Sequence, residues 1–277
     1  MNRRTGTFAA IVLAGDRGPE DPVARAAGVS CKALVPVGGR PMVLRVLDAL
    51  AGSPIIDSLL VCGSSSRLLG HSAELDGLVA SGRIRWAENE SSPSLSARAA
   101  LNVLHDDHPV LVTTADHALL TPQMVDYFCI HAAETGRDVV AGLARSDMVA
   151  AAFPESRRTV TRLRDGGYCG CNLFAFLTPR ARNAVAFWRR IEEQRKHPLK
   201  MVRVLGLVSV LRYLLGRLTL EEGLARLSVL MDACAGVVWM PDAQAAVDVD
   251  KVEDWMLAEE IIARCRTAEH KKPFCFH

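Results

Sequence analysis

The sequence predicts an α/β fold with a doubly wound, mostly parallel sheet and a helical insertion in its C-terminal half. Three observations support this fold class. Strand-like and helix-like segments alternate through the first half of the chain. The first strand-like segment is a continuous apolar run, as expected of a strand buried on both faces. Glycine or polar residues follow several strand-like runs, as they do where such sheets bind ligands.

The first half of the chain supplies the alternating elements. The apolar run Ala9–Leu13 predicts the first strand, and the leucine-valine stripe of Val43–Leu50 predicts a helix. The segment Ser94–Leu104 begins with a helix-capping serine. Thr121 and Pro122 suit the cap and the first position of a further helix. Three more strands are predicted at residues 58–62, 84–86 and 110–114.

The second half is less regular. Residues 179–232 carry a nearly continuous helical signal, which predicts a helical insertion within a single domain of residues 1–277. The segment Val252–Arg266 predicts a closing helix. Four strands are predicted around the insertion, at residues 138–144, 171–176, 236–240 and 245–249.

The stretch Phe8–Met42 favours phosphate binding. Gly15 and Gly18 lack a Cβ, so the backbone there can turn tightly and approach a ligand closely. Free N–H groups in such a loop form a concavity that attracts anions. Formal positive charge comes from three neighbouring residues, Arg17, Arg25 and Lys32. The spacing alone fits equally well with an ordinary glycine turn beside surface cations.

The longer pattern resembles a known family. Leu-Ala-Gly, a basic glycine-containing loop and then Lys-Ala-Leu-Val-Pro-Val-Gly-Gly-Arg-Pro-Met resemble the nucleotidyltransferase superfamily with the GT-A-like, Rossmann-like fold, and within it the MobA-like NTP transferase group. The resemblance implies that the loop and the lysine hold the NTP phosphates. Asp16 departs from the pattern, because many members have glycine there. The implied nucleotide-binding residues are Leu13, Ala14, Gly15, Arg17 and Lys32, and the implied catalytic residues are Lys32, Arg17 and Asp116.

The same resemblance implies a metal site. Asp116 follows the apolar strand Val110–Thr114, and Asp250 matches a late family motif in which an Asp or Asn ends a short strand before a helix. These two residues would hold Mg²⁺ or Mn²⁺, since Mg²⁺ is commonly bound by one or two carboxylates together with phosphate oxygens. Asp248 shares a face with Asp250 and would assist. Without a metal, Asp116 would be a turn residue and Asp250 a helix cap.

Two further pockets are predicted less directly. Ser91 and Ser94 fall where the family places a loop near the nucleotide base, although a capped helix after a polar loop explains them equally well. Asn172 precedes a strand that resembles the acceptor side of the family. A basic cluster in the insertion would clamp the acceptor's phosphate, or would be a solvated helix face; it consists of Arg195, Lys196 and Lys200.

Composition excludes several classes of protein. A formal net charge of +2 is too small to indicate nucleic-acid binding. Eight cysteines without a framework spacing indicate free thiols and a cytoplasmic location. The N-terminal apolar run is explained better as a strand than as a signal peptide. Met201–Leu215 is too short for a membrane span.

The apolar insertion leaves three roles open: internal packing, a homodimer interface, or contact with a bulky or lipid-like acceptor at a membrane surface.

These features predict a metal-dependent nucleotidyltransferase. It would join an NMP from CTP or GTP to a phosphorylated small molecule (a sugar, alcohol or cofactor phosphate) and release pyrophosphate. A GT-A-type glycosyltransferase usually carries Asp-x-Asp, and Thr114-Ala115-Asp116 lacks the first aspartate. A nicotinamide-dependent dehydrogenase needs Gly-x-Gly-x-x-Gly after the first strand, which is absent. A catalytically inactive nucleotide-binding or regulatory homologue remains an alternative, and Asp16 favours it.

Overall fold

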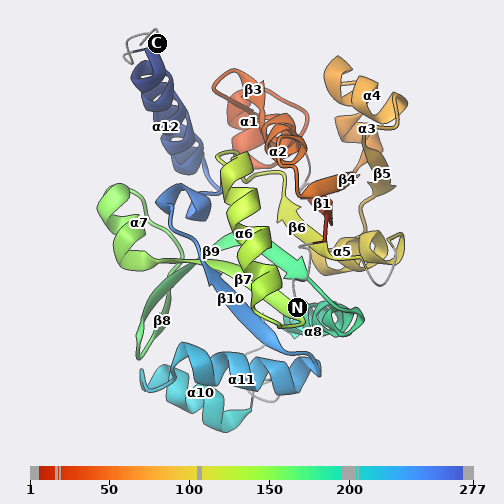
Figure 1. The fold of residues 1–277 in the computed structure, drawn as a ribbon. Coiled ribbons are helices and arrows are strands. Elements are labelled where there is room, and N and C mark those ends of the chain that lie inside the picture. Colours follow the sequence, from red (N-terminus) through yellow and green to blue (C-terminus); the bar gives the residue numbers. More distant parts are fainter. Residues whose placement is uncertain are drawn as a thin grey trace, which may run out of the picture.

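The fold is a mixed sheet between two layers of helices (Figure 1). The computed structural model describes residues 6–15, 18, 20–104, 108–194, 204 and 206–270. Within these residues the main sheet has eight strands, in the order β10-β7-β9-β6-β1-β4-β5, with β8 paired to β9. The predicted α/β class with a mostly parallel sheet is confirmed. The bounds of the strands are β1 Phe8–Ala14, β4 Ile56–Gly63, β5 Arg85–Glu88, β6 Val110–Thr114, β7 Val139–Arg145, β8 Thr161–Leu163, β9 Gly166–Phe176 and β10 Ala235–Trp239.

The parallel part of the sheet is formed by the early strands. β1 pairs in parallel with both β4 and β6, and β4 pairs in parallel with β5. β9 is antiparallel to its neighbours β6 and β7, while β10 and β7 are parallel. The carboxyl ends of β1, β4 and β6 therefore lie at one edge of the sheet, where ligands bind in this class of fold.

Helices cover both faces of the sheet. Along β1, Ala10 and Val12 point to the face covered by α2 and α6, whereas Ala9 and Ile11 point to the face covered by α5 and α8. All four side chains are at most 2% exposed, which explains why the strand is a continuous apolar run. The helices are α1 Pro22–Ala27, α2 Met42–Ala51, α3 Ser65–Leu68, α4 Ala73–Ala80, α5 Pro93–Asn102, α6 Pro122–Glu134, α7 Ser146–Ala152, α8 Arg182–Gln194, α10 Leu207–Leu214, α11 Leu220–Met231 and α12 Val252–His270.

Local sequence explains several boundaries. Thr121 caps α6, since its hydroxyl accepts a hydrogen bond from the N–H of Met124 at 3.2 Å. The cap of helix α5 lies two residues earlier than predicted: Ser92, not Ser94, is the cap, and its hydroxyl accepts a hydrogen bond from the N–H of Leu95. The predicted strand at 245–249 is absent, because residues 243–246 form a 3-10 turn instead.

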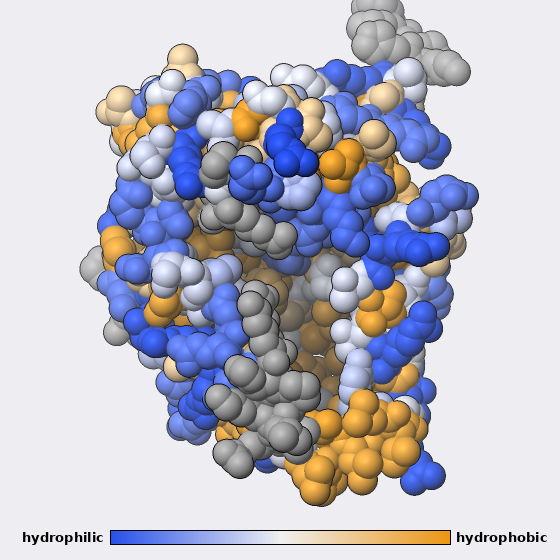
Figure 2. All heavy atoms as spheres, turned by 180° about the vertical axis from the view of Figure 1, so that it is seen from behind, coloured by the Kyte–Doolittle hydropathy of each residue, from blue (hydrophilic) through white to orange (hydrophobic). Residues whose placement is uncertain are grey.

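The C-terminal helices differ in how they pack. Helix α8 buries Ala184, Val185 and Phe187, and the first two belong to the core between α8 and the sheet. Helices α10 and α11 contain no buried residue among those described. The exposed apolar side chains of α10 form a patch at the lower edge of the molecule (Figure 2); they are Leu207, Val208, Leu211 and Leu214. The insertion boundary at 179–232 and the role of this surface stay predictions.

Two small elements complete the frame around the sheet edge. A two-stranded hairpin, β2 Pro36–Val37 with β3 Arg40–Pro41, follows a 3-10 turn at Lys32–Leu34. Another 3-10 turn, Pro179–Ala181, precedes α8. Across the described part of the chain, no helix is long and apolar enough to cross a membrane.

Candidate active site

Strand pairing brings the glycine loop and the first aspartate together. Leu13 pairs with Thr114 in the register of β1 and β6, and the N–H of Ala115 donates to the carbonyl oxygen of Leu13 at 3.0 Å. Both strands end at this level. The loop that begins at Gly15 and the turn that carries Asp116 therefore lie side by side.

A lysine ammonium group lies between two carboxylates at this edge. Lys32 Nζ is 2.6 Å from Asp116 Oδ2 and 2.9 Å from Asp250 Oδ1. The lysine side chain is 11% exposed, and those of Asp116 and Asp250 are 19% and 50% exposed. The hydroxyl of Thr114 donates to the other oxygen of Asp116 at 2.5 Å. Three residues from distant parts of the sequence thus face one point.

The electrostatics of this point favour positive charge. Burial acts on Lys32 by lowering its pKa, and this is the largest single effect. The charges of Asp116 and Asp250, with the hydrogen bonds they accept, together outweigh burial and raise the pKa of Lys32 above its usual value. The lysine is therefore charged at neutral pH. Two carboxylates that already hold one cation have the chemistry to hold another.

Asp248 hydrogen-bonds to neighbouring residues and not to Lys32. Its Oδ1 accepts a hydrogen bond from Arg158 Nη1 at 2.8 Å, and its Oδ2 accepts one from Asn172 Nδ2 at 3.0 Å. Burial raises the pKa of Asp248, and the negative charges of Asp116 and Asp250 raise it further, while Arg158 and Asn172 oppose the rise. Both carboxylate oxygens are thus engaged by protein donors. The structure does not bring Asp248 to the lysine with the other two aspartates.

The chemistry of the Lys32 cluster fits a magnesium site completed by a ligand. In the part of the chain that the structure describes, no group of three or more His, Cys, Asp or Glu side chains is arranged to hold a metal. Mg²⁺ bound by one or two carboxylates together with substrate phosphates and water needs no such group. Asp116 and Asp250 already converge on one cation, the ammonium of Lys32. These two residues could therefore hold Mg²⁺ alongside a triphosphate.

The predicted nucleotide loop is described only in part. Leu13 and Ala14 are buried at the end of β1, and Gly15 is exposed next to them. Asp16 and Arg17 lie outside the described residues. Gly18 has φ +97°, a conformation that favours glycine.

Arg67 is a loop neighbour that sequence reasoning missed. A Cβ on Gly18 would lie 3.2 Å from Arg67 Nη1, so the guanidinium is beside the loop. Arg67 lies in the short helix α3, which begins two residues after the end of β4. The available signal was that this strand ends at the same edge of the sheet as β1.

The predicted base-side serines are placed differently from one another. Ser91 is exposed in the loop before α5. Ser94 is 1% exposed, and its hydroxyl donates to Glu192 of α8. Ser94 thus contacts a helix of the protein, while Ser91 is the one of the two that solvent reaches.

The acceptor-side residues are also divided. Asn172 lies in β9 with φ +49° and donates to Asp248. Arg195, Lys196 and Lys200 lie outside the described residues.

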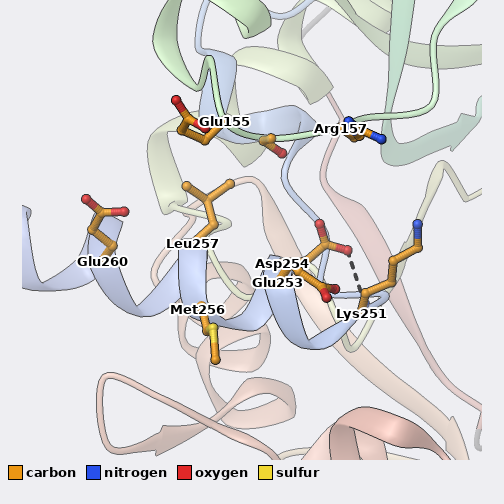
Figure 3. A pocket seen from close by; sticks show the side chains of 9 residues that line it. Glu155, Arg157, Lys251, Glu253, Asp254, Met256, Leu257 and Glu260 are labelled. Atoms are coloured by element: carbon orange, nitrogen blue, oxygen red, sulfur yellow. Dashed lines mark hydrogen bonds between the residues drawn. The ribbon is translucent and has the colours of Figure 1, made fainter.

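A groove of about 580 Å³ runs along α12 beside Asp250 (Figure 3). The side chains of Arg157 and Lys251 lie at one end of it, and Glu260 lies at the other. Lys251 follows Asp250 directly in the chain. The groove is lined by Glu155, Ser156, Arg157, Lys251, Glu253, Asp254, Met256, Leu257 and Glu260.

Comparison with known proteins identifies a family. The model of the MobA-like NTP transferase domain matches residues 10–231. A 2-C-methyl-D-erythritol 4-phosphate cytidylyltransferase of Frankia casuarinae is 29% identical over 265 residues, which cover 94% of this chain and 83% of that protein. The bifunctional protein GlmU of Sinorhizobium fredii is 33% identical over 117 residues, only 42% of this chain and 25% of GlmU.

Solved structures show the same architecture. A hypothetical transferase from Thermus thermophilus aligns with a TM-score of 0.73 at 32% identity, over 90% of this chain and 99% of that one. A 4-diphosphocytidyl-2C-methyl-D-erythritol synthase from Anaerococcus prevotii aligns with a TM-score of 0.57 over 94% of this chain and 97% of that one. Its identity is 16%, so this second likeness concerns the fold alone.

Proposed function

This chain belongs to the MobA-like NTP transferase family and is a nucleotidyltransferase, and we propose that it transfers CMP from CTP to a phosphorylated sugar or alcohol. GTP is the second candidate donor. The observation that carries the proposal is the placement of Lys32 between Asp116 and Asp250, beside the glycine loop. The cytidylyltransferase from Frankia casuarinae, which covers almost the whole chain, supports CTP as the donor.

The reaction exchanges one phosphorus–oxygen bond for another. A phosphate oxygen of the acceptor forms a bond to the α-phosphorus of the NTP. The bond from the α-phosphorus to the oxygen that bridges to the β-phosphorus breaks, and pyrophosphate leaves. A phosphate monoester is largely ionised near neutral pH, since its second pKa is about 6. The attacking oxygen therefore needs no strong general base.

The protein contributes groups that bind the metal and the charged phosphates. Asp116 and Asp250 would hold Mg²⁺, which would neutralise charge on the phosphates. Lys32 supplies a fixed positive charge for the α- and β-phosphates, because its raised pKa keeps it protonated. The backbone N–H groups of the loop around Gly15 and Gly18 orient the phosphate chain. Arg17 and Ser91 remain proposed contacts of the nucleotide.

The acceptor is proposed to enter from the groove along α12. Arg157 and Lys251 lie at the end of the groove where Asp250 precedes Lys251, so they suit the acceptor's phosphate (Figure 3). Asn172, Lys196 and Lys200 remain proposed contacts on the acceptor side. The free cysteines in the described part of the chain support the proposed cytoplasmic location.

Pyrophosphate release tests the proposal. Purified protein is incubated with Mg²⁺ and each of the four common NTPs, against a panel of phosphorylated sugars and alcohols. We expect release with CTP that requires both an acceptor and Mg²⁺. Release of NDP from an NDP-sugar, with none from any NTP, would identify a glycosyltransferase instead. Tight CTP binding without turnover on any acceptor would support a regulatory homologue.

A further inference from the structure

One buried arginine holds both ends of the segment that carries Asp250. Arg158 Nη1 donates to the carbonyl oxygen and to Oδ1 of Asp248, both at 2.8 Å. Arg158 Nη2 lies 3.2 Å from Asp254 Oδ1. The arginine side chain is only 8% exposed. A single guanidinium therefore spans residues on either side of Asp250.

The link from Arg158 reaches the backbone of Asp250 through one side chain. The second oxygen of Asp254, Oδ2, accepts hydrogen bonds from the N–H groups of Asp250 and Lys251, both at 3.1 Å. Arg158 Nη2 forms an ion pair with the first oxygen of the same carboxylate, without a hydrogen bond between them. The arginine thus draws the Asp254 carboxylate, and with it the start of α12, towards Asp248 by charge.

Asp250 needs such support because regular structure does not provide it. Residues 247–250 belong to no strand or helix. The Asp250 side chain is 50% exposed, so packing alone does not fix it. Besides the Asp254 contact, the ion pair of Asp250 with Lys32 and the hydrogen bond from Val249 N–H to the carbonyl oxygen of Asp116 tie this segment to the site.

We propose that Arg158 is a positioning residue for the metal site, a role that rests on the proposed function. It holds Asp248 and Asp254 so that the carboxylate of Asp250 meets that of Asp116 at one point. This explains why Asp248, although close in sequence to Asp250, binds protein donors: it is an anchor of the segment. Arginine suits the task because its planar guanidinium presents several donors at once, whereas a lysine ammonium acts as a single point charge.

The test separates the metal's share of nucleotide binding from the rest. CTP is titrated calorimetrically into the protein with Mn²⁺ and, separately, with EDTA. The Kd measured with EDTA, divided by the Kd measured with Mn²⁺, gives the contribution of the metal. In Arg158→Gln we expect this ratio to fall about tenfold or more towards one, since groups that orient metal ligands typically account for about 10–100-fold in affinity. The Kd in EDTA stays unchanged. Excess Mg²⁺ restores part of the lost turnover, which a merely structural defect would not allow.

A matched control and two milder variants complete the experiment. Arg145→Gln breaks another arginine–aspartate ion pair, with Asp147, at an exposed site and should leave the ratio unchanged. If Arg158→Gln does not fold, Arg158→Lys and Asp254→Asn keep most of the packing and are expected to lower the ratio in the same direction.

Each remaining outcome has a distinct meaning. A folded Arg158→Gln variant with the wild-type ratio would overturn the role of Arg158 while leaving the proposed function intact. Wild-type protein that binds CTP equally with Mn²⁺ and EDTA would contradict the metal site, and the positioning role with it. Wild-type protein that binds neither CTP nor GTP would contradict the proposed function.

Discussion

The backbone N–H of Val249 donates a hydrogen bond to the carbonyl oxygen of Asp116 at 3.1 Å. This bond joins the turn after β6 to the irregular segment before α12. It brings Asp250 next to Asp116, although most of the second half of the chain separates them in sequence. The two carboxylates share Lys32 as a result, and the predictions for the site follow from this arrangement.

Removing either carboxylate should abolish most turnover. In Asp116→Asn or Asp250→Asn, one of the two charges that face Lys32 is lost. We expect a fall in kcat of at least about 100-fold, the upper end of the range for groups that only orient a metal ligand. Steady-state pyrophosphate release at several Mg²⁺ concentrations measures it. Asp147→Asn, an exposed aspartate paired with Arg145, is the matched control. Wild-type rates in both site variants would place the metal elsewhere.

Lys32 should compete with a metal ion in the absence of nucleotide. Its ammonium lies within 3 Å of both carboxylates, so Lys32→Met removes the cation that they share. We expect the variant to bind Mn²⁺ alone about tenfold more tightly, or about 1.4 kcal/mol. This is well below the ~4 kcal/mol for two unit charges 4 Å apart at an effective dielectric constant of 20. The same variant should lose turnover, because the phosphates lose a cation.

Electron paramagnetic resonance of free Mn²⁺ gives the affinity. Arg25→Met, which removes an exposed cation that pairs with Glu20, should bind Mn²⁺ as the wild type does. Equal or weaker Mn²⁺ binding by Lys32→Met would show that the lysine does not occupy the metal's position.

The sequence allowed the fold and the centre of the site to be predicted for a physical reason. A strand buried on both faces is typically a continuous apolar run; β1 is such a run, and β6 begins with one at Val110–Val112. Residues directly after parallel strands must meet at one edge, so Gly15 and Asp116 could be placed together. The resemblance to the family then supplied Lys32 and Asp250.

The parts that sequence reasoning missed depend on contacts between distant, irregular segments. Asp248 and Asp250 share a face in any extended model, yet Asp248 pairs with Arg158, which no periodic pattern marks. Ser94 looked like a helix cap, but Pro93 starts the helix and makes Ser92 the cap. The strand expected at 245–249 has the right composition and lacks a partner strand, so a 3-10 turn forms.

Phe128, in the core between the sheet and α6, should contribute strongly to the stability of the protein. This side chain is 0% exposed and packs beside Gly142 of β7. Phe128→Ala is expected to lower the free energy of unfolding by about 3–5 kcal/mol, through lost apolar burial and a residual cavity. Ile130→Ala, in the same helix but 36% exposed, should cost much less. Urea denaturation followed by circular dichroism compares them, and equal losses would contradict the packing.

The cysteines should divide into reactive and inert thiols in the native protein. Burial, with a smaller contribution from the charge of Asp126, raises the pKa of Cys129 to about 12. Burial likewise raises the pKa of Cys171 to about 12. Because the thiolate is the nucleophile, at pH 8 only about one molecule in ten thousand carries the reactive form at either position. Cys234 and Cys265 are exposed.

Iodoacetamide at pH 8, followed by peptide mass spectrometry, should therefore modify Cys234 and Cys265 well before Cys129 and Cys171. In urea all four should react at similar rates, because unfolding removes the burial that raises the two pKa values. Cys129 lies on α6 and Cys171 on β9, and both belong to the core between the sheet and the helices α2 and α6. Fast labelling of either thiol in the native protein would mean that this core opens. Phe128→Ala should then accelerate labelling at Cys129, its neighbour in α6, more than at Cys171.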